Sequence, residues 1–146
     1  MKTRNVRSEM QIGSFERILE LKFPQSYRQF LLERGSAVVD GYKIFGISTQ
    51  EVETSVFEAT ETLRTHNPDL SKDFIAISIV KDRVRKEERV MCLDTKKDTL
   101  FEVSLTKDET VPMNKSFGEW LKVHQAYERR FREAYERVQR RRKETE

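Results

Sequence analysis

The stretch FPQSYRQFLLERGSAVVDGYKIFGI, residues 23–47, constrains the fold most, because a helical pattern changes there directly into a strand pattern. Pro24 suits the first turn of a helix, where its missing N–H is not needed. Tyr27, Phe30 and Leu31 then fall on one face of that helix, while charged residues face away. The first half of the stretch therefore predicts a short amphipathic helix.

The second half of the stretch predicts a hairpin. Gly35 ends the helix, because glycine readily takes the left-handed conformation that closes helix ends. Short strand-like runs follow on either side of Asp40 and Gly41, and Asp-Gly is a signal for a tight hairpin turn.

The remaining segments alternate between helical and strand patterns. An apolar repeat that starts at Ile12 predicts a first helix ending near Leu21. The other predicted elements are a helix from Ser55 that stops at Asn67 and Pro68, and strands over 73–80, 88–94 and 98–105. This order predicts an α+β fold with a largely antiparallel sheet flanked by helices.

A long helix is predicted at the C-terminal end. Ser116 and Glu119 have the spacing of a capping box. Apolar residues then recur by threes and fours over about 25 residues, which is more than a domain of this size needs to cover its core. They are Phe117, Trp120, Leu121, Tyr127, Phe131, Tyr135 and Val138, and His124 falls in the same repeat. The heptad-like spacing fits a homodimer through this helix, and core packing explains its first half equally well.

The length of 146 residues fits one domain, which we place at 1–146, with a core at about 12–121 and a basic helical extension at about 122–146. The N-terminal segment lacks the apolar run of a signal peptide. The longest apolar run, at 74–80, is far shorter than the roughly 20 residues that a membrane span needs. We therefore expect a cytoplasmic protein without membrane contact.

Residues with catalytic chemistry are few and scattered. Cys92 is the single cysteine and lies in a strand-like run, where we expect it to be buried. His66 falls at a predicted helix end and His124 on an apolar helix face, and Asp94 and Asp98 bracket a predicted turn. No phosphate-binding, zinc or calcium motif is present. We predict no catalytic residues, no metal site and no cofactor, and thus a protein that is not an enzyme.

Charge leaves two kinds of partner open. The net charge is +3, but residues 128–146 hold eight Arg or Lys against five Glu. Such a tail could bind a phosphate backbone, although the interleaved glutamates are also typical of a solvated helix, so nucleic acid is the disfavoured partner. The candidate partner-binding residues are Lys81, Arg83, Arg85 and Lys86 in one charged segment, and Arg129 and Arg132 in the last helix.

The order of these segments resembles the SUKH superfamily of Smi/Knr-like domains, which includes fungal cell-wall regulators and bacterial immunity proteins, and is most similar to single-domain bacterial proteins of the YobK type. The resemblance covers about residues 12–121. It rests on Phe23, Pro24, Tyr27, Phe30 and Leu31, which match the helix signature of the family, and on Cys92, Leu93 and Asp94, which match its Cys-Leu-Asp strand end.

The resemblance implies a protein that binds a cognate secreted toxin domain and blocks it by stoichiometric contact. The alternative is a nucleic-acid-binding or regulatory scaffold module that uses the basic C-terminal helix. Gly35 and Ser36 stand where the family often has asparagine and glycine, and the basic helix beyond Leu121 is outside the family pattern. The matching residues belong to the core, so a partner site is expected on exposed loops and helix faces.

Overall fold

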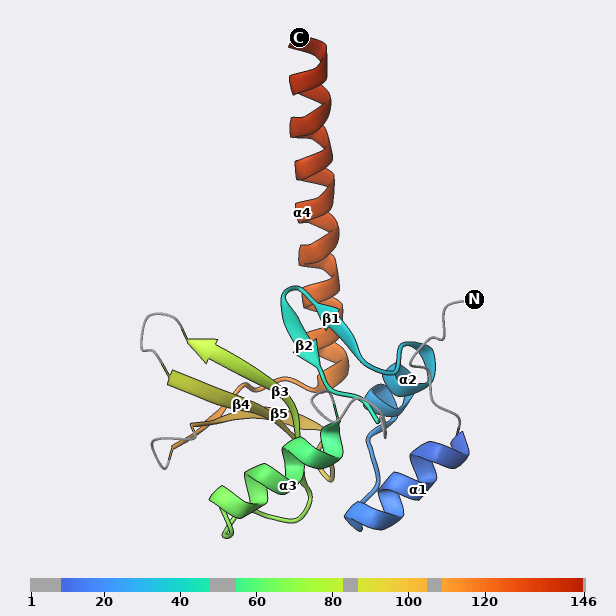
Figure 1. Ribbon diagram of the computed structural model, residues 1–146, viewed down its shortest axis with the longest axis vertical. Helices are drawn as coiled ribbons and strands as arrows, with labels where there is room; N and C mark the ends of the chain where they lie inside the picture. The colour runs from blue at the N-terminus through green and yellow to red at the C-terminus, as the bar shows by residue number, and fades with distance from the viewer. Residues whose placement is uncertain (1–8, 48–54, 83–86, 105–108, 146) are drawn as a thin grey trace.

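The computed structural model describes residues 9–47, 55–82, 87–104 and 109–145, with the side chain of residue 82 excepted. Figure 1 shows the arrangement of its helices and strands. In chain order these are α1 Glu9–Leu19, α2 Gln25–Glu33, β1 Ala37–Val39, β2 Tyr42–Ile44, α3 Val56–His66, β3 Phe74–Asp82, β4 Glu87–Asp94, β5 Thr99–Ser104, β6 Thr110–Pro112 and α4 Phe117–Thr145.

The strands form one four-stranded antiparallel sheet in the order β3-β4-β5-β6 and a separate hairpin of β1 and β2. The hairpin is attached to the edge strand β3 by two hydrogen bonds. Phe45 N donates to Ile77 O at 2.8 Å, and Ser78 Oγ donates to Lys43 O at 2.8 Å. The predicted α+β fold with a largely antiparallel sheet is confirmed.

Strand β6 was not predicted from the sequence. It is three residues long, every residue in it is exposed, and it ends at Pro112. A short exposed strand carries no apolar alternation, and proline is tolerated only at such an edge. Its pairing with β5 therefore gives no sequence signal.

Apolar side chains cover both faces of the large sheet. Successive residues of β4 point to opposite faces, so Cys92 packs in the cluster under α3 while Met91 and Leu93 pack in the larger cluster with α2, the hairpin and the start of α4. Cys92 is fully buried, as predicted, and burial raises the pKa of its thiol.

The centre of the larger cluster is Tyr27 on α2. Its ring packs edge-on against Phe23 and Phe117 and is stacked with Phe30. Its hydroxyl donates a hydrogen bond of 2.6 Å to the carbonyl of Phe45, at the end of the hairpin. The predicted apolar face of this helix is therefore confirmed as the surface that holds the hairpin and α4 together.

The ends of α1 and α2 are set by residues with positive φ. Helix α1 ends at Leu19, because Glu20 adopts φ 58° and turns the chain, so the predicted end near Leu21 was wrong by two residues. Helix α2 is closed by Gly35, with φ 74°, as predicted. Glutamate seldom takes this conformation, which is why the first end could not be located from sequence.

The turn between β4 and β5 is organised by Asp94, as the sequence predicted. Its Oδ1 accepts hydrogen bonds from the backbone N–H groups of Lys96 at 3.0 Å and Lys97 at 3.2 Å. Asp98 follows with φ 50°. Burial raises the pKa of the Asp98 carboxyl, and a hydrogen bond from the backbone N–H of Phe117 opposes that rise.

Helix α4 begins with the predicted capping box. Glu119 N donates to Ser116 Oγ at 3.1 Å, and Ser116 N donates to Glu119 Oε1 at 3.3 Å. The helix has 29 residues, or about 44 Å at 1.5 Å per residue, and only Phe117 and Trp120 are buried. Its second half projects from the body of the molecule (Figure 1). Among the described residues, no helix combines the length and apolar character that crossing a membrane requires.

Because Gly46 lies close to the end of α2, we expect an added methyl group to destabilise the fold more at Gly46 than at Gly13. A Cβ at Gly46 would lie 2.3 Å from the carbonyl oxygen of Gly35, which is backbone and cannot move aside. We expect Gly46→Ala to lower the free energy of unfolding by about 1–3 kcal/mol. Gly13→Ala is the control, because nothing lies within 4 Å of its Cβ, and it should raise that free energy by about 0.5–1 kcal/mol. Urea denaturation followed by circular dichroism measures both, and equal effects would contradict the packed contact.

The buried Tyr27 hydroxyl predicts a change of stability in alkali. Tyr27→Phe should cost about 1–2 kcal/mol at pH 8, because Phe45 O loses its donor. Burial raises the pKa of Tyr27 above that of an unfolded tyrosine, near 10. The unfolded chain therefore releases this proton first, and the tyrosine's contribution is lost as pH rises past about 10.

The stability difference between wild type and Tyr27→Phe should accordingly shrink between pH 8 and about pH 10.5. Urea denaturation at both pH values measures it. Tyr135→Phe, at an exposed position, serves as the control and should leave the pH dependence unchanged. A difference that stays constant with pH would argue against the buried hydroxyl.

Candidate partner-binding surface

The sequence-predicted residues occupy separate elements. Lys81 lies near the end of β3, is exposed, and forms a long ion pair of 4.0 Å with Glu88. Arg129 and Arg132 lie on the exposed half of α4. Arg83, Arg85 and Lys86 are outside the described residues. The structure therefore does not gather the described candidates into one basic patch, and their role in binding stays a prediction.

The tip of the β1–β2 hairpin lies between the end of β3, which carries Lys81, and the exposed half of α4, which carries Arg132. One hollow lies between the tip and β3 and is lined by Lys81 as well as Asp40 and Gly41. A second hollow of about 560 Å³ lies between the tip and α4. It is lined by Asp40, Gly41, Glu128, Phe131, Arg132 and Tyr135. The hairpin tip is thus the common wall of both hollows.

The conformation of the tip follows from its two residues. Asp40 has φ 50° and Gly41 has φ 83°, so both take the left-handed conformation that a two-residue hairpin of this kind requires. The register pairs Val39 with Tyr42 on either side of the turn. The hairpin predicted from Asp-Gly is confirmed.

A contact between His124 and Asp40 fixes the tip against α4. His124 Nδ1 lies 2.6 Å from Asp40 Oδ2. Since a carboxylate accepts hydrogen bonds and does not donate them, Nδ1 carries the proton. The imidazole also packs against the rings of Tyr42, Trp120 and Tyr127, with centroids 4.4–5.7 Å apart. The pairing joins residues 84 positions apart, so no local pattern could have revealed it.

The environment of Tyr42 shows that this junction is partly shielded from water. Burial is the main cause that raises the pKa of its hydroxyl, and the negative charges of Glu102 and Asp40 add to it. Its ring also packs edge-on against Trp120 at 5.3 Å. The first two turns of α4 are therefore held by aromatic packing at the hairpin.

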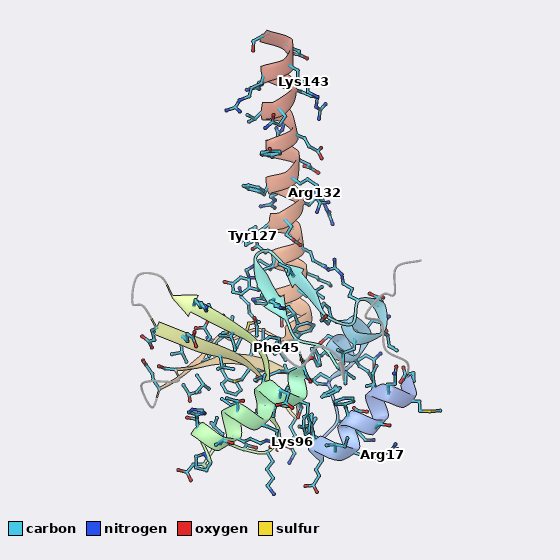
Figure 2. The ribbon with its side chains drawn as sticks, in the orientation of Figure 1. Arg17, Phe45, Lys96, Tyr127, Arg132 and Lys143 are labelled. Carbon is cyan, nitrogen blue, oxygen red and sulfur yellow. The ribbon has the colours of Figure 1, made fainter. Side chains whose placement is uncertain are left out.

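Beyond this junction the apolar pattern of α4 continues into solvent. We call Tyr127, Phe131, Tyr135 and Val138 the α4 stripe. The spacing places them on one helix face, and they are between 48 % and 75 % exposed. The sequence pattern runs without interruption from Phe117 to Val138, so it did not show where burial stops. Figure 2 shows Tyr127, Arg132 and Lys143 on the projecting helix.

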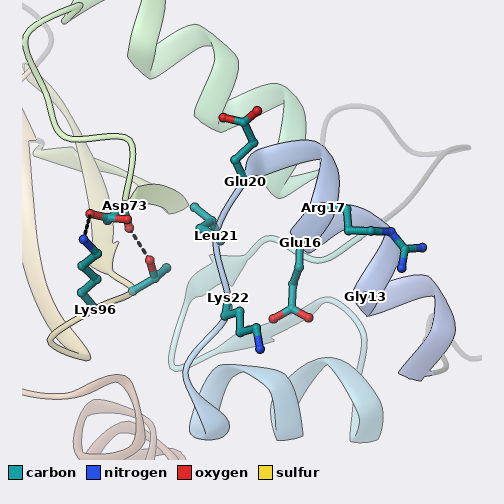
Figure 3. A pocket seen from close by; sticks show the side chains of 9 residues that line it. Gly13, Glu16, Arg17, Glu20, Leu21, Lys22, Asp73 and Lys96 are labelled. Carbon is teal, nitrogen blue, oxygen red and sulfur yellow. Dashed lines mark hydrogen bonds and ion pairs between the residues drawn. The ribbon is translucent and has the colours of Figure 1, made fainter.

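Another hollow lies at the far end of the molecule, near Arg17 and Lys96 (Figures 2 and 3). Asp73, in its wall, is held by structural contacts. Asp73 Oδ2 lies 3.4 Å from Lys96 Nζ, and the Asp73 carbonyl accepts from Thr95 Oγ1 at 2.6 Å. Within the described parts of the chain, no group of three or more His, Cys, Asp or Glu side chains is placed to hold a metal ion.

Glu16, which also lines that hollow, is buried and holds the neighbouring loop. Its two oxygens accept hydrogen bonds from Phe23 N at 2.7 Å and Arg28 Nη2 at 2.9 Å. Both contacts tie α1 to the start of α2. Glu16 and Asp73 in the walls of this hollow thus already serve the fold, whereas the α4 stripe exposes apolar groups that the fold does not use.

Comparison with known proteins gives a family for most of the chain. The family model SUKH_5, described as SMI1-KNR4 cell-wall, matches residues 2–125. A crystal structure of a protein from Pseudomonas syringae pv. tomato is similar in fold, with a TM-score of 0.59, 18 % sequence identity and 80 % of each chain covered. Among curated protein sequences, none matches the chain significantly. The family match ends just before the α4 stripe begins.

The contact between His124 and Asp40 predicts an energetic coupling between the hairpin and α4. Asp40→Asn keeps a residue that tolerates positive φ, and His124→Phe keeps a ring. We expect each variant to lower the free energy of unfolding by about 1 kcal/mol, and the double variant to cost little more than either alone. Chemical denaturation of the four proteins gives the coupling energy. Fully additive losses would show that the two side chains do not support each other.

Proposed function

Because the chain belongs to the SUKH superfamily, we propose that it is an immunity protein that binds a cognate secreted toxin domain and blocks it by stoichiometric contact in the cytoplasm. The observation that carries the proposal is the combination of this family core with an exposed surface that the core does not need, formed by the hairpin tip and the α4 stripe. Apolar side chains exposed together on a soluble domain commonly mark a site of protein contact.

The proposal includes no catalytic turnover, and the positions of the reactive side chains support that. Cys92 is buried and its thiol has a raised pKa, which disfavours the nucleophilic thiolate. His124 is held by Asp40 and by three aromatic rings. His66 lies at the exposed end of α3, where Nδ1 contacts the carbonyl of Thr62 at 2.9 Å. None of the three has the nucleophile and base arrangement of a covalent catalyst.

The charge of the chain limits how it would block a toxin. The net charge is +3, whereas an inhibitor that fills the basic cleft of a nuclease is expected to be acidic. Contact away from such a cleft, or a toxin that is not a nuclease, fits the charge better. The arginine-rich half of α4 favours a second candidate, a nucleic-acid-binding or regulatory scaffold module.

Affinity capture from lysate of the native host tests the proposal. We expect the tagged full-length chain to retain one protein in near one-to-one amount through moderate and then high salt, with mass spectrometry as the readout. Co-expression of that partner should be toxic alone and harmless together with this chain. A retained protein whose toxicity is not blocked would contradict the immunity function. Nucleic acid released by salt, with no protein partner, would favour the second candidate.

A further inference from the structure

The α4 stripe has a distinct charged border. A helix turns by about 100° per residue, so Arg130, Arg137 and Arg141 all lie about 80–120° from Phe131, on the same side. We call these three residues the arginine edge. No acidic residue falls at this angle between Tyr127 and Thr145. The stripe is therefore bordered on one side by positive charge alone.

The other border of the stripe faces the hairpin. Glu128, Arg132 and Tyr135 line the hollow next to Asp40 and Gly41, so the hairpin tip stands on that side of the helix. The arginine edge does not line that hollow. A partner that lies along the stripe would thus meet the hairpin tip on one side and the arginine edge on the other.

A second copy of this chain is a poor occupant of the stripe. With Phe131 and Val138 at the a positions of a heptad, Tyr127 and Ala134 take the d positions, which is the seam of a two-helix coiled coil. In a parallel pair Arg137 would face Arg142 of the other copy, and in an antiparallel pair Arg130 would face Arg137. Either arrangement sets like charges against each other, which weakens the pairing.

A phosphate backbone or an anionic lipid surface also fits less well. On the side of the stripe that faces the hairpin, Glu128 and Gln139 lie about 60–80° from Phe131, where one would repel an anionic surface and the other adds no positive charge. The apolar stripe is also narrow, whereas a helix that lies in a membrane interface presents a broad apolar face. An amphipathic helix with acidic residues along its apolar face matches both the narrow α4 stripe and the arginine edge.

We propose that the exposed half of α4 binds an acidic amphipathic helix of another protein. The apolar face of that helix packs on the α4 stripe, and its Asp or Glu side chains pair with the arginine edge. The distance from Tyr127 to Arg141 is about 21 Å along the helix, so the bound segment has about four turns. This proposal goes beyond the immunity function, since it holds for a toxin or for any other partner.

A pair of synthetic peptides tests the proposal with the full-length chain. Both have three heptads with Leu or Ile at the a and d positions, and they differ only in carrying Glu or Lys at the e and g positions. Fluorescence anisotropy of the labelled peptides at low and moderate salt gives the dissociation constants. We expect the Glu peptide to bind at least about tenfold more tightly than the Lys peptide, and to weaken as salt rises.

Matched variants of the chain then locate the contact. Arg130→Glu with Arg137→Glu should reverse the preference between the peptides. Arg129→Glu with Arg140→Glu makes the same change of net charge on the opposite helix face and should keep it. Phe131→Ala with Tyr135→Ala should weaken the Glu peptide by about tenfold or more. All six positions are exposed, so unfolding curves should show that the fold is retained.

Four outcomes would overturn the proposal. The first two are equal binding of the two peptides and equal effects of the two arginine pairs. The third is that an anionic vesicle or a single-stranded oligonucleotide binds more tightly than the Glu peptide, and that Phe131→Ala with Tyr135→Ala abolishes this binding. The fourth is a dimer in sedimentation that the same double variant dissociates. The last two would assign the stripe to a membrane or nucleic acid, or to a second copy of the chain.

Discussion

The hydrogen bond from the buried Tyr27 hydroxyl to the carbonyl of Phe45 is the contact on which the rest of the structure depends. It joins α2 to the hairpin inside the larger apolar cluster, where a lone carbonyl would be costly. The same ring packs against Phe117, the first residue of α4. One side chain thus fixes the relative positions of the helix, the hairpin and the start of the long helix. The hairpin tip in turn receives His124 of α4, so the direction in which α4 leaves the body follows from this core.

Patterns with a local physical cause were predictable from the sequence. The apolar face around Tyr27, the Asp40–Gly41 turn and the Ser116–Glu119 cap each depend on residues within one turn or one hairpin, and all three were confirmed. Features that depend on distant residues or on a rare conformation were not. The end of α1 needs a positive φ at Glu20, and β6 has no apolar face.

In the candidate surface, too, the local pattern was predictable from the sequence and the contacts between distant residues were not. The periodicity of the last helix was evident, but an a and d pattern looks identical whether it meets a core or solvent. Only the structure shows that the core uses Phe117 and Trp120 and leaves Phe131 uncovered in the described chain. The contact between His124 and Asp40, which marks the boundary, joins distant parts of the chain. The prediction of Lys81 and Arg132 as binding residues rests on their charge alone, and in the structure the two line separate hollows on either side of the hairpin tip.

The exposed half of α4 needs its own source of stability, because it packs on little of the domain. Its sequence provides one: Glu128 and Arg132, Glu133 and Arg137, and Glu136 and Arg140 are spaced by four with the glutamate first, the orientation that stabilises a helix most. The anchored and capped first turns also remove the cost of nucleation.

A partner would consequently bind a helix that is already formed. Its binding energy would not have to offset the entropic cost of ordering that helix. Arg130 and Arg141 have no glutamate four positions away, and their nearest acidic neighbours on the helix are Glu133 and Glu144, three positions after them. These pairs stabilise a helix less than the glutamate-first spacing of four does, so the two arginines are held less strongly by the helix itself and can pair with acidic side chains of a partner.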